Sequence, residues 1–150
     1  MYPFIGSNYA FKHEIFADDG LFRNDLGPGT PTMGEDTEFI ERLMTKGKTL
    51  YYCGKALVWH PFDSQRMNLR HIAQWHIALG KFDTQRERKS GKKFFYYFGV
   101  PRYLFKGMAK DFLFLIANIV NKKSFYNSWR RFFRKVGMIT EYRFLQRKHH

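Results

Sequence analysis

The sequence holds a single cysteine, Cys53, and no long hydrophobic run. One cysteine excludes an intramolecular disulfide and a cysteine-based metal cluster, which fits a reducing compartment. The longest apolar run, FLFLIANIV at 112–120, is well short of the roughly 20 residues that span a bilayer, so we expect no membrane-crossing helix. The chain opens MYPFIGSNYAFKHE, without a basic start and an apolar stretch, and we therefore expect no signal peptide.

Acidic residues are scarce in the second part of the chain. Residues 61–150 hold twenty Lys and Arg against five Asp and Glu, a net charge of +15, whereas residues 1–60 hold six against eight, a net charge of −2. This asymmetry indicates a polyanionic partner, either nucleic acid or an anionic membrane surface. Aromatic residues, in contrast, are abundant at 19% of the chain, which argues against disorder.

Turn signals and hydrophobic periodicity predict an α/β order of elements. We expect, in order, a strand at 5–12, a helix at 13–20, a loop at 24–34, a helix at 35–46, strands at 48–52 and 56–60, and a helix from 63 or 64 to 79 closed by Gly80. The polar segment 81–93 is predicted to be a linker. Two aromatic-rich helices should follow at about 101–121 and 124–136, with Pro101 and Ser124 as start signals.

The stretch GEDTEF, residues 34–39, places three acids at the start of a predicted helix. Such acids interact favourably with the helix dipole, by ~0.3–1 kcal/mol each, and Thr32 with Glu35 can form a capping box. At about 100° per residue, however, Asp36 falls on the centre line of the apolar stripe of Phe39, Ile40, Leu43 and Met44. A carboxylate placed there, under a Gly/Pro-rich loop, is a candidate for chemistry in a cleft. The sequence is compatible with both a catalytic role for Asp36 and simple stabilisation of the helix dipole.

The segment ALVWHP raises a similar choice for His60. In a strand, Ala56, Val58 and His60 share one face, and His60 emerges at the strand's end just before Pro61. Strand ends that face a cleft are where α/β sheets place ligands. The alternative is a structural role, because a lone histidine is more often structural than a metal ligand.

Two long segments in this order resemble the C-terminal half of the catalytic domain of family 2 glycosyltransferases of the GT-A fold. They are GSNYAFKHEIFADDGLFRNDLGPG and GEDTEFIERLMTKGKTLYYCGKALVWH. The resembling motifs are G-x-N-x-A-F-[KR], the F…LG loop, the GED helix and the V-x-H strand end, and the likeness covers about residues 6–80. It implies a partial GT-A, Rossmann-like sheet portion over residues 1–83, followed by a linker and a basic, amphipathic helical extension over 84–150.

The chain departs from the family's pattern in two ways. It contains neither the nucleotide-binding first half with its D-x-D metal motif nor the Q-x-x-R-W motif of processive synthases. The resemblance therefore implies the C-terminal portion of a non-processive transferase that uses a nucleotide-sugar donor and a divalent metal, Mg²⁺ or Mn²⁺. The main metal ligands would lie outside this chain.

The resemblance also implies a role for each candidate residue. Asp36 would be the general base of an inverting transfer to an acceptor hydroxyl, Glu35 would shape the site, and His60 would help to hold the metal. Gly6 and Asn8 would line the sugar pocket. The implied acceptor is a glycan or a lipid-linked glycan in cell-surface glycan synthesis. The chain alone should be inactive, and we expect it to pair with an N-terminal fragment or to form a homo-oligomer.

The basic second half predicts a membrane-surface location. In SFYNSWRRFFRKVG, an apolar stripe of Phe125, Trp129, Phe132, Phe133 and Val136 is flanked by arginines and lysines. This is the composition of helices that lie in a bilayer interface, so we expect residues 92–150 to bind the cytoplasmic face of the cell membrane without crossing it. Core packing is the alternative for the stripe. Two further alternatives for the whole chain are a non-enzymatic nucleic-acid-binding module and a membrane-bound catalytic remnant without activity.

Overall fold

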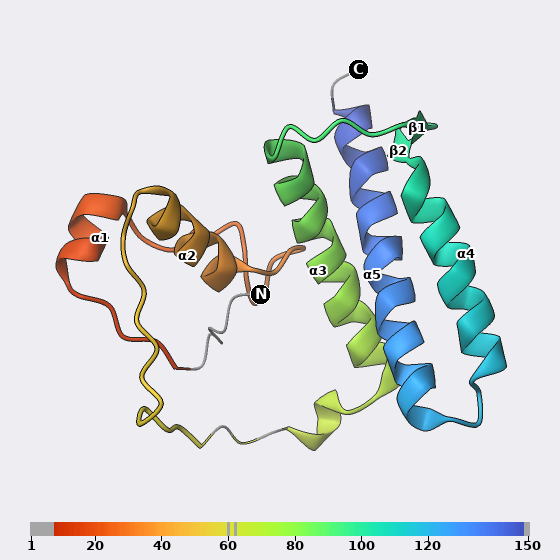
Figure 1. Cartoon of the computed structure of the whole chain (residues 1–150), viewed down its shortest axis with the longest axis horizontal. Helices are drawn as coiled ribbons and strands as arrows, with labels where there is room; N and C mark the ends of the chain where they lie inside the picture. The colour runs from red at the N-terminus through yellow and green to blue at the C-terminus, as the bar shows by residue number, and fades with distance from the viewer. Residues whose placement is uncertain (1–7, 60, 62, 149–150) are drawn as a thin grey trace. The chain divides into compact units, whose positions relative to one another are not determined.

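The computed structural model describes residues 8–59, 61 and 63–148, and over these residues the protein is predominantly helical (Figure 1). It contains five α-helices and one two-stranded antiparallel sheet in the described part of the chain. The predicted α/β class, with a Rossmann-like GT-A sheet portion, is therefore wrong. Residues 48–52 and 56–59 alternate like strands but adopt no regular structure, because a strand forms only where a second strand takes up its backbone hydrogen bonds.

The chain is divided into two compact units, Met1–Asp63 and Ser64–His150. The division expected from the sequence, between residues 83 and 84, falls instead inside helix α3 (Leu69–Lys89). Each unit is described by itself below.

The first unit is built on α1 (Glu14–Asp19) and α2 (Glu35–Thr45), two helices that the sequence predicted. Helix α2 buries Phe39, Ile40 and Leu43, whereas Met44, expected on the same stripe, is 44% exposed. The Phe39 ring lies within a cluster of aromatic rings, with centroid distances of 4.3 to 5.9 Å to Phe11, Phe16 and Phe22. Aromatic packing therefore takes the place of a sheet as the core of this unit.

Charged side chains join the end of α1 to the end of α2. The buried Asp19 carboxylate lies 3.0 Å from the Lys46 ammonium and 3.3 Å from that of Lys48. The hydrogen bond from Lys46 is the main reason why the pKa of Asp19 is lowered. The Arg42 guanidinium of α2 donates hydrogen bonds to the backbone carbonyls of Asp19 and Leu21. These bonds link α2 to the C-terminal end of α1.

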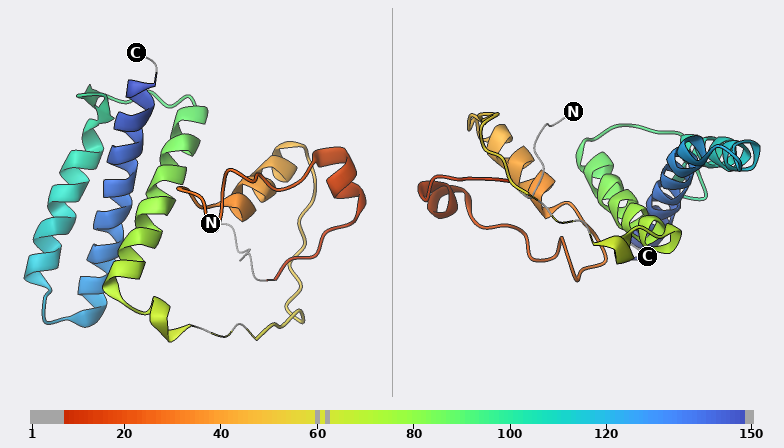
Figure 2. Two further views of the ribbon diagram at one scale, coloured as in Figure 1. Left: turned by 180° about the vertical axis from the view of Figure 1, so that it is seen from behind. Right: turned by 90° about the horizontal axis from the view of Figure 1, so that it is seen from below.

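The second unit consists of three long helices with a small hairpin. Helices α3, α4 (Arg102–Ala117) and α5 (Lys122–Arg147) lie side by side with α5 in the middle, packed extensively against both others (Figures 1 and 2). A 3₁₀ turn, η1 (Ser64–Arg66), precedes α3, and strands β1 (Tyr96–Tyr97) and β2 (Val100–Pro101) connect α3 to α4. The apolar core is formed by Val100, Leu104, Met138, Ile139 and Tyr142.

Helix α3 differs from its predicted form at both ends. It begins at Leu69, where the Asn68 side chain accepts a hydrogen bond from the His71 amide at 2.8 Å, instead of at 63 or 64. It also continues through Gly80 to Lys89, so most of the predicted linker 81–93 is helical. Gly80 does not stop the helix because it is a packing residue: a Cβ atom there would lie 2.0 Å from the Arg134 carbonyl oxygen of α5.

The two C-terminal helices confirm the predicted positions with changed bounds. Helix α4 begins directly after Pro101, as expected, and ends at Ala117. Helix α5 is capped by Asn121, whose side chain accepts from the Ser124 amide at 3.1 Å, and it extends to Arg147 instead of ending near 136. The predicted start signal Ser124 therefore lies inside the first turn.

Several polar groups are buried between these helices. The His76 Nε2 atom accepts a hydrogen bond from Arg130 Nε at 3.0 Å, while His76 Nδ1 has no hydrogen-bond partner within the described residues. Burial first, and then the charges of Arg130 and Arg134, lower the pKa of His76 to about 4. Burial alone would raise the pKa of the Asp111 carboxyl, but hydrogen bonds from Lys135 and Arg131 lower it.

Candidate functional site

The candidate site lies at the first turn of α2, under the loop 24–34. The loop is held together by its own hydrogen bonds: the Gly27 amide donates to the Thr32 carbonyl at 3.0 Å and the Thr30 hydroxyl donates to the same carbonyl at 2.6 Å. The Thr32 hydroxyl donates to the Asp25 carbonyl at 3.3 Å. Thr32 therefore does not form the predicted capping box with Glu35, and the N-cap residue is Gly34, without a side-chain cap.

Glu35 lies against the loop at Gly27. A Cβ atom on Gly27 would lie 2.8 Å from the Glu35 carboxylate, and the Gly27 φ of +99° is one that other residues rarely adopt. Glycine at this position therefore allows the carboxylate to approach the loop backbone closely.

Asp36 is half-buried, and its hydrogen bonds come from the neighbouring residue. Its Oδ1 atom accepts from the Thr37 amide at 2.7 Å and from the Thr37 hydroxyl at 3.3 Å. The Tyr9 phenol lies near enough to feel the charges of Asp36 and Glu35. Burial, followed by these charges, raises the pKa of Tyr9 to about 12, so the phenol stays protonated at neutral pH.

Asn8 directly precedes Tyr9 in the sequence. Its side-chain amide donates to the Ala56 carbonyl at 2.5 Å, which holds the segment at Asn8 against the segment that leads to His60. The structure thus brings together Asn8, Tyr9, Glu35 and Asp36 within the first unit. Gly6 and His60, the other predicted site residues, lie outside the described residues.

A pocket of about 610 Å³ opens next to these residues. Its walls include polar and charged side chains, among them Asn8, Tyr9, Lys12, Glu14, Asp18 and Lys48, together with the aromatic ring of Tyr51. Hydrogen-bonding groups beside an aromatic ring suit a hydroxyl-rich ligand. Asp36 and Glu35 are not part of the wall, and Tyr9 is the residue that both lines the pocket and lies near Asp36.

The described residues do not form a complete binding site for the predicted metal ion. They contain no group of three or more His, Cys, Asp or Glu side chains placed to hold a metal ion. The carboxylates of Glu35 and Asp36 are a pair without a third such ligand among these residues. We therefore derive no step through a metal.

Tyr9 is the site residue that sequence reasoning missed. The sequence feature that could have identified Tyr9 is its spacing of two residues from Phe11. In the structure the Tyr9 and Phe11 rings lie 5.7 Å apart, and the Phe11 ring lies 5.1 Å from the Phe39 ring of α2. Residues two apart in an extended segment share one face. The packing of Phe11 against α2 therefore also brings Tyr9 to the acids at the start of that helix.

Comparisons of the chain with protein-family models, with curated proteins and with solved structures gave no match.

Proposed function

We propose that this chain is the acceptor-side part of an inverting glycosyltransferase, which transfers a sugar from a nucleotide-sugar donor to an acceptor hydroxyl in cell-surface glycan synthesis. The observation that carries the proposal is the placement of Asp36. Its carboxylate lies at the first turn of α2, half-buried, with Thr37 as its hydrogen-bond donor and the Tyr9 phenol nearby. A carboxylate held in this way has a defined direction and is still open to a further hydrogen bond.

In the proposed reaction Asp36 acts as the general base. It takes the proton of the acceptor hydroxyl while that oxygen forms a bond to the anomeric carbon. The bond from the anomeric carbon to the diphosphate oxygen breaks, and the electron pair leaves with the diphosphate, so the configuration is inverted. The hydrogen bonds from Thr37 restrain the carboxylate during the transfer, and Glu35 positions the loop through its contact with Gly27.

The donor-binding part of the enzyme would come from outside this chain. Neither the D-x-D motif nor a nucleotide-binding βα unit is present in the sequence. A separate N-terminal fragment, or a further copy of the chain, is the proposed partner, and His60 together with residues of that part would serve the divalent metal. The purified chain alone is then inactive.

The experiment measures sugar transfer in cells of the source organism. The chromosomal gene is replaced by the wild type, Asp36→Asn or Glu38→Gln, and transfer of labelled sugar from nucleotide donors to the membrane and glycan fractions is followed. Asp36→Asn keeps the shape but removes the base, so we expect transfer to fall by ~10²–10⁴-fold. Glu38→Gln is the matched control, because Glu38 lies on the same helix turn but pairs with Arg42 at 3.3 Å.

Equal transfer by the Asp36→Asn and Glu38→Gln strains, at equal protein levels, would refute the assignment of Asp36. A wild-type strain that transfers no more labelled sugar than a strain without the gene would refute the enzymatic function itself.

A further inference from the structure

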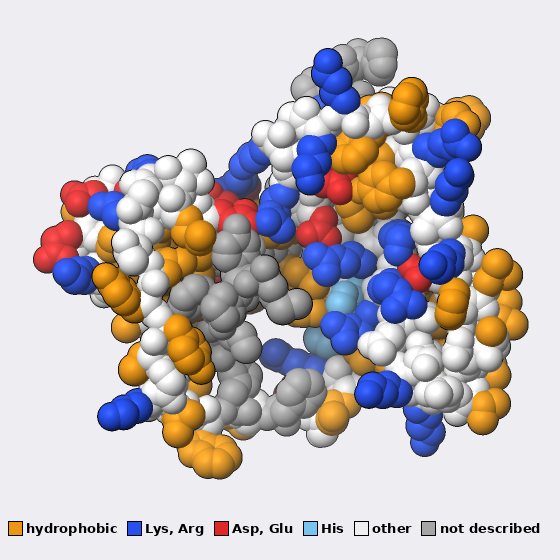
Figure 3. All heavy atoms as spheres, in the orientation of Figure 1, with side chains coloured by type: hydrophobic (Ala, Val, Ile, Leu, Met, Phe, Trp, Pro, Cys, Tyr) orange, Lys and Arg blue, Asp and Glu red, His pale blue; other side chains and the backbone are white. Residues whose placement is uncertain are grey.

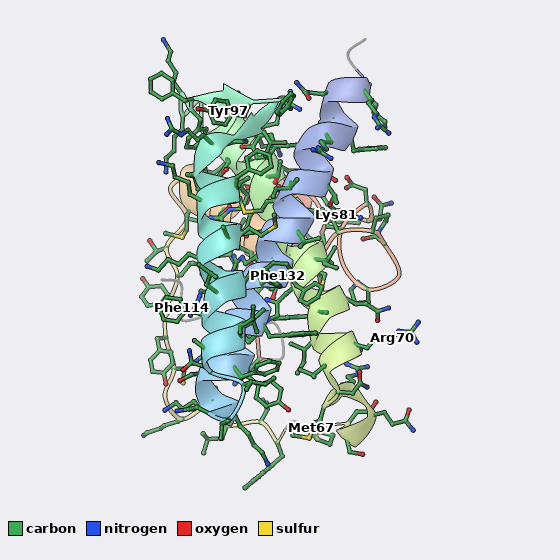
Figure 4. The ribbon with its side chains drawn as sticks, turned by 90° about the vertical axis from the view of Figure 1, so that its right-hand side faces the viewer. Met67, Arg70, Lys81, Tyr97, Phe114 and Phe132 are labelled. Carbon is green, nitrogen blue, oxygen red and sulfur yellow. The ribbon has the colours of Figure 1, made fainter. Side chains whose placement is uncertain are left out.

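Helix α4 leaves an apolar surface uncovered in the second unit. Six side chains of its C-terminal half and of the following turn are between 46% and 91% exposed. We call them the α4 surface: Phe112, Leu113, Phe114, Ile116, Ile119 and Val120. Figure 3 shows hydrophobic side chains along the edge that α4 forms, and in Figure 4 Phe114 projects away from the neighbouring helices.

The stripe that the sequence placed on α5 is half-buried within the unit. Its aromatic rings lie against one another, with centroid distances of 5.7 Å between Phe125 and Trp129 and 4.6 Å between Trp129 and Phe133. The Trp129 indole donates to the Leu69 carbonyl of α3 at 3.1 Å. Core packing therefore accounts for part of this stripe, whereas the side chains of the α4 surface are exposed.

The charge around the α4 surface is positive. Lys106, Lys110, Lys122 and Lys123 are exposed on α4 and on the first turn of α5, and the Lys110 ammonium lies 5.8 Å from the centroid of the Phe114 ring. Between residues 88 and 140 the sequence holds one acid, Asp111. Asp111 is buried and paired with Arg131 and Lys135, so it does not offset the charge of the four exposed lysines.

Two arginines of α5, in contrast, are bound by side chains of α3. Arg134 makes two hydrogen bonds to the Asp83 carboxylate, at 2.5 and 2.9 Å, and Arg130 donates to His76. The exposed cations that border the α4 surface are instead lysines that, within the described residues, make no ion pair with α3.

We propose that the α4 surface docks on an anionic lipid bilayer, with its apolar side chains in the interface and the bordering lysines at the headgroups. An apolar patch bordered by lysines is the arrangement of proteins that lie on a membrane. The cytoplasmic leaflet supplies the negative charge. None of the helices in the described residues has the length and hydrophobicity of a membrane-crossing segment. The proposal is independent of the transfer reaction.

Two other partners fit the α4 surface less well. Four of its six side chains, Leu113, Ile116, Ile119 and Val120, are aliphatic, whereas bases of nucleic acid stack on aromatic rings. A second copy of this chain would bring like charges together around the contact, which opposes association.

The first experiment is flotation of the full chain with vesicles. Neutral phosphatidylcholine vesicles are compared with vesicles that contain about 30 mol% phosphatidylglycerol, at low and high salt. We expect binding to the anionic vesicles that weakens with salt. Leu113→Ser with Ile116→Ser should weaken it by at least about tenfold, because two exposed side chains can no longer enter the interface. Leu57→Ser, at a position 85% exposed in the first unit, is the control and should bind normally.

The lysines are tested by Lys122→Gln with Lys123→Gln. Binding to anionic vesicles should fall by about fivefold for each lysine removed, whereas binding to neutral vesicles should not change. Arg88→Gln with Lys89→Gln removes the same charge from the exposed end of α3 and should have no comparable effect.

A label places the contact even if the serine variant fails to fold. Cys53 is the only cysteine, so Cys53→Ser gives a background for Ile116→Cys or Gln74→Cys carrying an environment-sensitive fluorophore. Anionic vesicles should shift the emission to the blue for the label at 116 and not for the label on α3 at 74.

Three results would overturn the proposal: equal shifts at both labels, equal binding to neutral and anionic vesicles, or tighter salt-sensitive binding to an oligonucleotide than to vesicles. A stable dimer in light scattering that the double serine variant abolishes would also overturn it, in favour of a second copy.

Discussion

The crossing of α3 and α5 at Gly137 yields the sharpest prediction about stability. A Cβ atom on Gly137 would lie 2.1 Å from the Ile77 carbonyl oxygen and 2.8 Å from the Ile77 Cα atom. Both are backbone atoms of α3, which cannot turn aside as a flexible side chain can. Gly137→Ala therefore has to separate the two helices, by on the order of 1 Å, in an interior that is otherwise closely packed.

The expected magnitude follows from three contributions. Overpacking of this kind costs ~1–3 kcal/mol. The hydrogen bond from the Thr84 hydroxyl to the Met138 carbonyl, 3.3 Å long at the same crossing, contributes about 1 kcal/mol and would be strained or lost. Alanine is favoured over glycine inside a helix by about 1 kcal/mol, which offsets part of the loss. The net loss is about 2 kcal/mol, or roughly 10 °C in Tm for a unit of this size.

Thermal unfolding followed by far-UV circular dichroism measures the effect, with Gly107→Ala as the matched control. Gly107 also lies inside a helix, α4, but its added Cβ would meet only the Lys135 side chain, 2.5 Å away at Cε, which can move. Gly107→Ala should therefore leave Tm unchanged or raise it slightly. If Gly137→Ala is as stable as Gly107→Ala, then α3 and α5 are not in close contact through Gly137, and the reasoning fails.

Two further predictions concern the second unit. The pKa of His76 is lowered to about 4 from an ordinary value near 6.5, so His76 is neutral in the folded protein at neutral pH. As the pH drops, the unfolded chain gains the proton first. The free energy of unfolding therefore falls between about pH 6.5 and about pH 4, by up to ~3 kcal/mol. Urea unfolding at several pH values should show this slope in the wild type and a reduced one in His76→Gln; equal slopes would contradict it. Phe98 lies in the two-residue turn between β1 and β2, is 88% exposed and has a φ of +49°. Asparagine is preferred at such a φ, so Phe98→Asn should raise the free energy of unfolding by about 1 kcal/mol. Phe95→Asn, at a position 89% exposed outside the turn, should give no gain in the same unfolding assay, and a gain as large as that of Phe98→Asn would show that the backbone angle is not the cause.

The helices could be predicted from the sequence because their signals are local. The acids and Gly34 at the start of α2 and Pro101 before α4 each mark a helix start within a few residues. The strands could not be predicted in the same way. Because successive side chains of a strand point to opposite faces, the sequence predicts which residues of 56–60 would share a face. A strand also requires a neighbouring strand to pair with, and the described residues contain no such strand beside this segment.

Gly80 shows how a local signal can mislead. A glycine after an apolar helical stretch often ends a helix, yet here α3 continues and Gly80 lets the Arg134 backbone approach. The information that decides between these two roles lies on α5, more than fifty residues further along the chain, as the spacing of the Thr84–Met138 hydrogen bond illustrates.

The same distinction applies to the candidate site and to the apolar surfaces. The helix start places Glu35 and Asp36 together, and this follows from the sequence. The proximity of Tyr9 to Asp36 depends on how a distant segment packs through Phe11. Helical periodicity likewise says which residues of α4 and α5 share a face, but not which of the two faces another helix covers.

The central position of α5 has a consequence for synthesis of the protein on the ribosome. Helices α3 and α4 pack extensively against α5, which is made after both of them. Until α5 has left the exit tunnel, the apolar faces of α3 and α4 lack the helix that covers them, and contacts such as Thr84 with Met138, 54 residues apart, cannot form. The nascent second unit is therefore exposed to aggregation and to chaperone binding for most of its own translation. A ribosome that stalls within α5 leaves the second unit without its complete core, whereas one that stalls before α3 leaves the first unit's aromatic cluster complete.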